Sequence, residues 1–324
     1  MRLDIRYATT FSYDAPVRES QNELRACPAT DARQALVHYH VTTTPSSRVT
    51  SYVDFWGTRV DTFGIRAPHD RLEVVAEATV ETDAQPPLAD TVDVAEVGAP
   101  LFVENHLEYL QPSPHVRWSG DVADAAHACR ESAGPRLADV VMAVHDRCSE
   151  LTYRTGETYV GVPVDDVFRG GSGVCQDFAH LSLAMYRELG IPARYVSGYL
   201  FAVDDATGQD AGADEVRVET HAWVEVAVPG QGWYALDPTN RQPVGERHVT
   251  IGRGRDYDDV APFRGVFNGR SEHTLEVVVT MRRLAVEPTG SALTSEPERA
   301  VRGHAAVGAA ASRDQALQVA QQQQ

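Results

Sequence analysis

The sequence predicts an α+β protein, in which a β-rich N-terminal domain precedes a domain of helices packed on an antiparallel sheet. From residue 1 to about residue 83, apolar and polar residues alternate with turn residues between the runs, as in half-buried strands. Two later segments, 121–134 and 135–151, space their apolar residues by three and four, as in amphipathic helices. Beyond residue 190 the period returns to two, which indicates a second sheet.

Changes in composition divide the chain into four parts. We expect the N-terminal domain to span residues 1–85. Residues 86–118 lose the periodicity and gather proline, aspartate and glycine, which predicts a linker. The second domain follows at 119–285. Residues 286–324 are rich in alanine, glutamine and small polar residues, which predicts a disordered tail.

Charge and cysteine usage limit the partners and the compartment. The 29 basic residues face 46 acidic ones, and a net charge of −17 argues against nucleic acid or an anionic membrane as a partner. No apolar stretch approaches the roughly 20 residues of a membrane span, and the first residues lack the apolar core of a signal peptide. The four cysteines lie far apart without a CxxC pair, so we expect reduced thiols and a cytoplasmic location.

The stretch GSGVCQDFAHLSLAMYRELG, residues 171–190, places Cys175 at the start of an amphipathic helix. In a first helical turn, free backbone N–H groups and the helix dipole stabilise a thiolate and can hold an oxyanion. Gly171 and Gly173 would leave room for a substrate backbone. The competing interpretation is a buried, inert thiol. We expect that state for the other three cysteines, Cys27, Cys129 and Cys148.

A histidine and an aspartate in the following strands complete a possible catalytic set. In THAWVEVAV, His221 lies on the face opposite four apolar residues. Asp237 ends the next strand, where a carboxylate can orient an imidazole. Taken alone, each could be a surface histidine or a turn aspartate. Together with Cys175 they supply a thiol, a base and an orienting carboxylate.

The hairpin between these strands allows a test of parity. Facing residues of an antiparallel pair share a face of the sheet. If Val228 opposed Trp233, Asp237 and His221 would point to opposite sides. We therefore predict an odd-length loop or a one-residue bulge between Val226 and Ala235.

A metal site is the alternative use of such residues. Cys175, Asp177, His180 and His221 include ligand types. Residues five apart on a helix do not share a face, so Cys175 and His180 diverge, and no CxxC or HxxxH pair is present. We expect no metal and no cofactor.

Three motifs resemble the core of the transglutaminase-like superfamily, which has a papain fold. They are GVCQDFAHLSLAMYRELGIPARYVSGYL, HAWVEV and GWYALDPTN. More closely, the chain is similar to bacterial transglutaminase-like proteins that are often described as cysteine proteases. Their N-terminal domain is matched by YATTFSYDAPV and NELRACP, and a later motif by GRDYDDVAPFRGVFNG, so the resemblance covers about residues 1–285. One departure is local, since Tyr7 and Ala8 stand where the family's first strand usually has a histidine.

This resemblance implies a nucleophile at Cys175, a base at His221 and a third triad member at Asp237, on a helix packed against an antiparallel sheet. It also implies that the polar loop at residues 253–257 covers the site.

Each of four neighbouring side chains has more than one interpretation. Asp177 can favour the helix dipole or hold the loop before the cysteine. We expect His180 to be a packed, hydrogen-bonded residue. Trp223 and Tyr199 can form cleft walls or pack in the core.

The expected function is acyl transfer, in which Cys175 attacks a carboxamide and forms a thioester. Water as acceptor gives a peptidase or amidase, and an amine gives a transglutaminase. We favour hydrolysis of a peptide or protein amide, since neither a calcium-loop spacing nor an extended acceptor region is visible. The alternative from another class is a catalytically silent peptide-binding module. The oligomeric state stays open.

Overall fold

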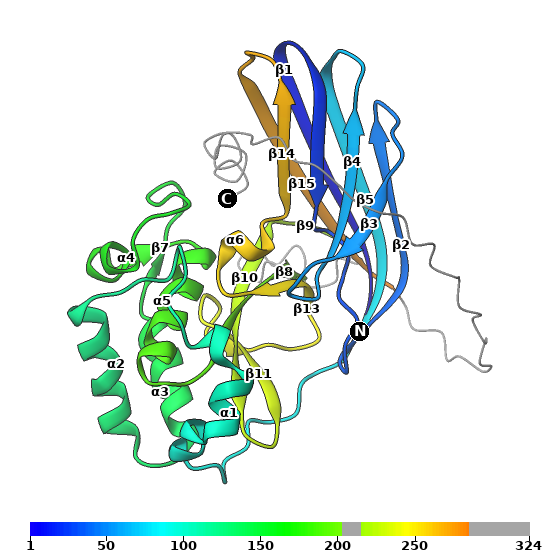
Figure 1. Cartoon of the computed structure of the whole chain (residues 1–324). Coiled ribbons are helices and arrows are strands. Elements are labelled where there is room, and N and C mark those ends of the chain that lie inside the picture. Colours follow the sequence, from blue (N-terminus) through cyan, green and yellow to red (C-terminus); the bar gives the residue numbers. More distant parts are fainter. Residues whose placement is uncertain (203–214, 285–324) are drawn as a thin grey trace, which may run out of the picture.

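Two antiparallel sheets, a short parallel strand pair and a layer of helices make up the protein (Figure 1). The computed structural model describes residues 1–202 and 215–284, so the expected tail at 286–324 lies outside the described residues. The α+β class is confirmed. Among the described residues, no helix has the length and apolarity needed to cross a membrane.

The larger sheet has eight strands and joins the two ends of the described chain. The long first strand pairs with four others, two of which come from the C-terminal part. The sheet that begins the N-terminal domain is therefore completed by residues beyond 262, which we had assigned to the second domain. Its strands are β1 (Arg2–Leu24), β2 (Gln34–Thr44), β3 (Thr50–Val53), β4 (Arg59–Ile65), β5 (His69–Thr82), β9 (Glu215–Val218), β14 (Phe263–Asn268) and β15 (His273–Arg283).

The smaller sheet lies between the helices and the larger sheet (Figure 1). Its order is β12-β11-β10-β8-β13, antiparallel throughout. Tyr199 of β8 and the apolar residues of β13 join the core of the larger sheet. Ala193 and Tyr195 of β8, with apolar residues of β10 and β11, join the core under the helices. The strands are β8 (Ala193–Leu200), β10 (Thr220–Val228), β11 (Gly232–Asp237), β12 (Gln242–Pro243) and β13 (His248–Gly254).

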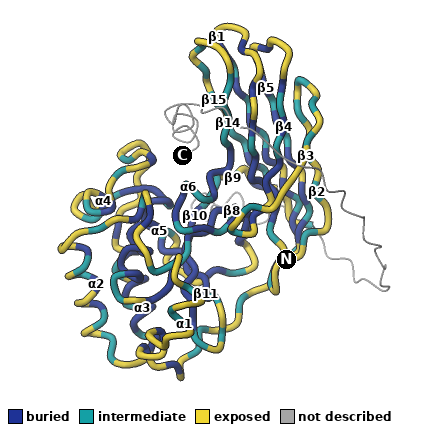
Figure 2. The backbone as a smooth tube through the Cα atoms, viewed as in Figure 1, coloured by how far each residue is buried: buried dark blue, intermediate teal, exposed yellow. Residues whose placement is uncertain are grey.

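Helix α5 (Cys175–Glu188) is the centre of the helical layer, and Figure 2 shows its backbone in the colour of buried residues. Twelve of its side chains are buried, with Phe178, Leu181 and Met185 in the apolar core. It contacts β8 and β10 on one side and three helices on the other. These helices are α2 (Gly120–Ala133), α3 (Leu137–Cys148) and α4 (Val164–Gly170).

The segment that we expected to be a linker, residues 86–118, contains short helical turns that belong to the helical layer. Val94, Val97 and Val116 are buried in its core. Such short turns span too few residues to show a helical period, so the sequence reads as irregular. They are η1 (Val94–Gly98), α1 (Pro100–Asn105) and η2 (Leu107–Tyr109).

The hairpin between β10 and β11 has the odd-length loop predicted from parity. Val228 pairs with Gly232, which leaves a loop at residues 229–231. Gly230 and Gly232 have φ angles of 75° and 90°, which favour glycine. This register places Asp237 on the same face of the sheet as His221.

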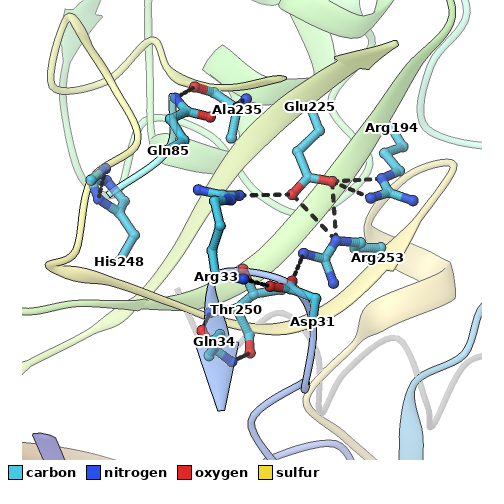
Figure 3. A network of polar contacts seen from close by, with 11 residues as sticks. Asp31, Arg33, Gln34, Gln85, Arg194, Glu225, Ala235, His248, Thr250 and Arg253 are labelled. Carbon is cyan, nitrogen blue, oxygen red and sulfur yellow. Dashed lines mark hydrogen bonds and ion pairs between the residues drawn. The ribbon is translucent and has the colours of Figure 1, made fainter. Parts of the chain in front are cut away.

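A buried ion-pair network joins the smaller sheet to the N-terminal domain (Figure 3). The Glu225 side chain on β10 is 1% exposed and accepts hydrogen bonds from Arg194 Nε at 2.6 Å and Arg253 Nε at 3.0 Å. Arg253 also binds Asp31, and Arg33 lies 3.9 Å from Glu225. Burial alone would raise the pKa of Glu225, but the arginines outweigh it and lower the pKa to about 2. The network therefore needs an ionised carboxylate.

We predict that Glu225→Gln lowers the free energy of unfolding by about 3–5 kcal/mol at pH 7, because it removes the buried carboxylate that pairs with Arg194 and Arg253. The contribution of Glu225 is complete above the ordinary glutamate pKa of 4.5 and is lost as the pH falls towards 2. The difference in the free energy of unfolding between the variant and the wild type should therefore decrease as the pH falls from 4.5 towards 2. Urea unfolding at several pH values measures it.

The control is Glu150→Gln, which removes an exposed pair with Arg147. That change should cost less than about 1 kcal/mol. Equal losses in the two variants at pH 7 would refute the prediction.

Candidate active site

Cys175 begins α5 after a tight loop and is partly exposed, unlike the other three cysteines. Gly171 ends α4 in the left-handed region with a φ of 69°. The next two residues form β7 (Ser172–Gly173), which pairs in parallel with β6 (Thr152–Tyr153). The Cys175 side chain thus lies at the positive end of the helix dipole, as expected.

Asp177 holds this loop in place. Its Oδ2 accepts hydrogen bonds from the Val174 backbone N–H at 2.8 Å and from the Thr158 hydroxyl at 2.6 Å. A Cβ at Gly173 would lie 2.6 Å from the same oxygen. Glycine at 173 therefore makes room for Asp177, and Gly171 provides the left-handed turn. We had expected both glycines to make room for substrate, and the loop itself explains them.

His221 and Asp237 meet as the sequence predicted. His221 Nε2 lies 2.8 Å from Asp237 Oδ2, and the aspartate side chain is fully buried. Asn240 donates to the same carboxylate, from its backbone N–H at 3.1 Å and from Nδ2 at 2.7 Å. A fourth bond comes from His248 Nε2 at 3.0 Å. Burial would raise the pKa of Asp237, but the two histidines hold it well below its usual range.

Cys175 and His221 form the reactive pair of the site. Both side chains line the same cleft, and because Nε2 of His221 faces Asp237, Nδ1 is the nitrogen left for the thiol. Burial lowers the pKa of His221, but the Asp237 carboxylate and the Cys175 sulfur outweigh it and raise the pKa to about 10.

Trp223 and Tyr199 pack in the core rather than line a cleft. Trp223 is fully buried, with ring centroids 5.9 Å from His221 and 5.3 Å from His248. Tyr199 is 2% exposed and belongs to the core of the larger sheet. A Cβ at Gly198 would collide with the Trp223 ring and with the Val249 carbonyl oxygen. Because residue 198 has no side chain, the Trp223 indole can pack there, next to the rings of His221 and His248.

His180 is packed as expected. It is 4% exposed, its Nε2 accepts a hydrogen bond from the Tyr257 backbone N–H at 3.3 Å, and its ring stacks on His115. In the polar loop at 253–257, Tyr257 lines a small cavity next to Cys175. The two arginines of that loop pair with acidic side chains, Arg253 with Glu225 and Arg255 with Asp259.

A cleft of about 580 Å³ opens at Cys175 and His221. Sequence reasoning missed Tyr153, Glu219 and Asn240 along it, and His248 behind it. Only Asn240, three residues after Asp237, lies within a motif that we had singled out. The residues that line the cleft are Tyr153, Cys175, Leu200, Ala202, Arg217, Val218, Glu219, Thr220, His221, Thr239 and Asn240.

Among the described residues, His221, Asp237 and His248 have the ligand types and the proximity of a metal site. Their nitrogen to oxygen separations of 2.8 and 3.0 Å are those of hydrogen bonds. Hydrogen bonding therefore accounts for the arrangement without an ion. Cys175, Asp177 and His180 are absent from this group, in line with the expected divergence on the helix.

Comparison with known proteins identifies the family. The profile of the transglutaminase-like superfamily matches residues 123–238, and that of the bacterial transglutaminase-like N-terminal region matches residues 3–81. An uncharacterized protein of Mycobacterium leprae is 37% identical over 284 residues, covering 88% of this chain and 99% of the relative. The chain belongs to the transglutaminase-like superfamily.

A second relative and one solved structure are also similar to this chain. An uncharacterized protein of Mycobacterium tuberculosis is 33% identical and covers 85% of this chain and 90% of its own length. A crystal structure from Cytophaga hutchinsonii, described as a "Putative Cysteine Protease", has a TM-score of 0.66 at 22% identity and covers 89% of this chain and 93% of that one. This structural likeness shows the fold alone.

We predict that Asp237→Asn lowers the pKa of His221 from about 10 towards its ordinary value of 6.5, because burial is then opposed by the Cys175 sulfur alone. Nitrogen-15 NMR of the histidine rings, followed across pH, measures it. The control is Asp139→Asn, which removes an exposed carboxylate paired with Arg136. A His221 pKa that does not move in Asp237→Asn would contradict the assigned electrostatics.

We also predict that Gly198→Ala lowers the free energy of unfolding by about 1–3 kcal/mol, since the added methyl group collides with the Val249 carbonyl oxygen and the Trp223 ring. Chemical denaturation measures the loss. In the control, Gly120→Ala, the new methyl group meets open space at the start of α2, so stability should stay constant or rise slightly. Equal effects at both positions would show that the indole has room to move.

Proposed function

We propose that the protein is a cysteine amidase or peptidase that cleaves a peptide or protein amide through a thioester on Cys175. One observation carries the proposal. A partly exposed thiol at a helix N-terminus lines the same cleft as His221, whose Nε2 is hydrogen-bonded to the buried Asp237 carboxylate. This is the arrangement that activates a thiol and fixes the orientation of its base.

In the proposed reaction, the Cys175 thiolate attacks the carbonyl carbon of the amide. The backbone N–H groups of the first turn of α5 can hold the oxygen of the tetrahedral intermediate. His221 then gives its Nδ1 proton to the leaving nitrogen, the carbon–nitrogen bond breaks, and the thioester remains. Water attacks the thioester while His221 takes its proton, and the acid leaves with the thiolate restored. Asp237 keeps the imidazole oriented throughout.

Amine transfer is the second candidate reaction for the same thioester. A Pseudomonas aeruginosa protein described as a protein-glutamine gamma-glutamyltransferase is 39% identical over 77 residues, which cover 24% of this chain and 11% of that protein. Such a transferase would use an amine in place of water and form a new amide. The absence of a calcium-loop spacing and of an extended acceptor region favours water.

The thiol must be reduced for either reaction, and all four cysteines are free. We therefore propose that the protein works in the cytoplasm, where thiols stay reduced. A peptide or protein amide is the proposed partner. The cleft of about 580 Å³ beside Cys175 has the size to take several groups of such a substrate.

The test is to incubate the protein with a glutamine-rich protein such as casein and a dansylated primary amine. We expect ammonia or new amino termini to be released without incorporation of the dansyl label. Incorporation in proportion to ammonia release would establish the transferase instead. The chain contains no lysine, so its own side chains cannot act as the amine acceptor and obscure the result.

The paired controls are Cys175→Ala and Cys129→Ala. The first should lose turnover completely, and the second should keep it, because Cys129 packs among α2 and α3 away from the cleft. A lack of turnover in the wild type, together with iodoacetamide labelling of Cys175 no faster than in the unfolded chain, would favour the peptide-binding module.

A further inference from the structure

His248 lies behind the candidate triad and has no assigned role. It begins β13, two strands away from β10 in the sheet, and its side chain is 2% exposed. Its Nε2 lies 3.0 Å from Asp237 Oδ2, the same oxygen that binds His221. The carboxylate that orients the base is therefore shared by two histidines.

The hydrogen bonds of His248 define its tautomer. The Gly245 backbone N–H donates to His248 Nδ1 at 3.3 Å, so Nδ1 is an acceptor and carries no proton. The proton of a neutral ring then lies on Nε2, which donates to Asp237.

The packing around the ring keeps it in that place. The Trp223 indole meets His248 edge-on, with 5.3 Å between ring centroids, and fills the space that Gly198 leaves empty. Leu200, the pairing partner of His248 on β8, aligns the start of β13. The imidazole can thus reach the Asp237 oxygen that also binds His221.

We propose that His248 is a positioning residue of the site, whose Nε2–H holds the Asp237 carboxylate ionised and oriented towards His221. The inference rests on the proposed roles of Cys175 and His221. An ionised carboxylate with no exposed surface needs a donor at each lone pair that water would otherwise occupy. Asn240 supplies two donors from the turn after β11, and His248 supplies one from β13, at the edge of the sheet.

A pair of substitutions separates the donor from the volume of the ring. His248→Gln keeps an N–H at the distance of Nε2 along the side chain, whereas His248→Met fills similar space without a donor. The readout is the second-order rate of iodoacetamide alkylation of Cys175 at pH 7, located by mass spectrometry. We expect the Met variant to react about tenfold more slowly than wild type, as for one pKa unit of lost stabilisation of the charged pair. The Gln variant should recover most of that loss.

A role in packing alone would give equal alkylation rates in the Gln and Met variants at equal thermal stability, and this would overturn the proposal. Alkylation of wild-type Cys175 no faster than in the unfolded chain would instead refute the activated thiol of the proposed function. The two failures are thus distinguishable.

A second measurement needs no variant to fold. Nitrogen-15 NMR of the wild-type histidine rings should show that the neutral form of His248 is the Nε2–H tautomer. The Nε2 proton should also be shifted downfield by its bond to a carboxylate. A neutral ring with its proton on Nδ1 would overturn the proposed donor.

Discussion

The buried charge of Asp237 sets the requirements that its surroundings meet. An ionised carboxylate without exposed surface is stable only where protein donors replace water. These donors come from three elements, His221 on β10, Asn240 in the turn after β11 and His248 at the start of β13. Each contact that satisfies the charge also fixes a side chain near Cys175. Charge stabilisation and site geometry are therefore provided by the same hydrogen bonds.

A second buried carboxylate lies on the same face of β10. Glu225 is two residues beyond Trp223 and binds arginines from β8 and β13, while Asp31 and Arg33 extend the network into the N-terminal domain. The strand that carries His221 is thus anchored by ion pairs at one end and by the Asp237 hydrogen bonds at the other. Through this strand the N-terminal domain becomes part of the scaffold of the candidate site, since its contacts stabilise the sheet that holds the base.

Much of the candidate site follows from local pattern. The start of α5 after two glycines identifies Cys175, and the alternation in β10 places His221 opposite its apolar face. The odd loop before β11 follows from parity alone, because a strand repeats every two residues and Asp237 has to share the face of His221. These features are encoded by consecutive residues, so the period and the turn chemistry of one segment are enough to predict them.

The remaining features come from residues that are distant in the chain. Nothing near His248 in the sequence indicates that it meets Asp237, since β13 and β11 are separated by two strands. The burial of residues 86–118, the pairing of β14 and β15 with β1, and the need for glycine at 198 likewise follow from which surfaces pack together. The sequence by itself determined the α+β class, the nucleophile candidate and its two partners. The tertiary fold added His248 and the cleft, because long-range hydrogen bonds, ion pairs and packing cannot be predicted from the periodicity of a single segment.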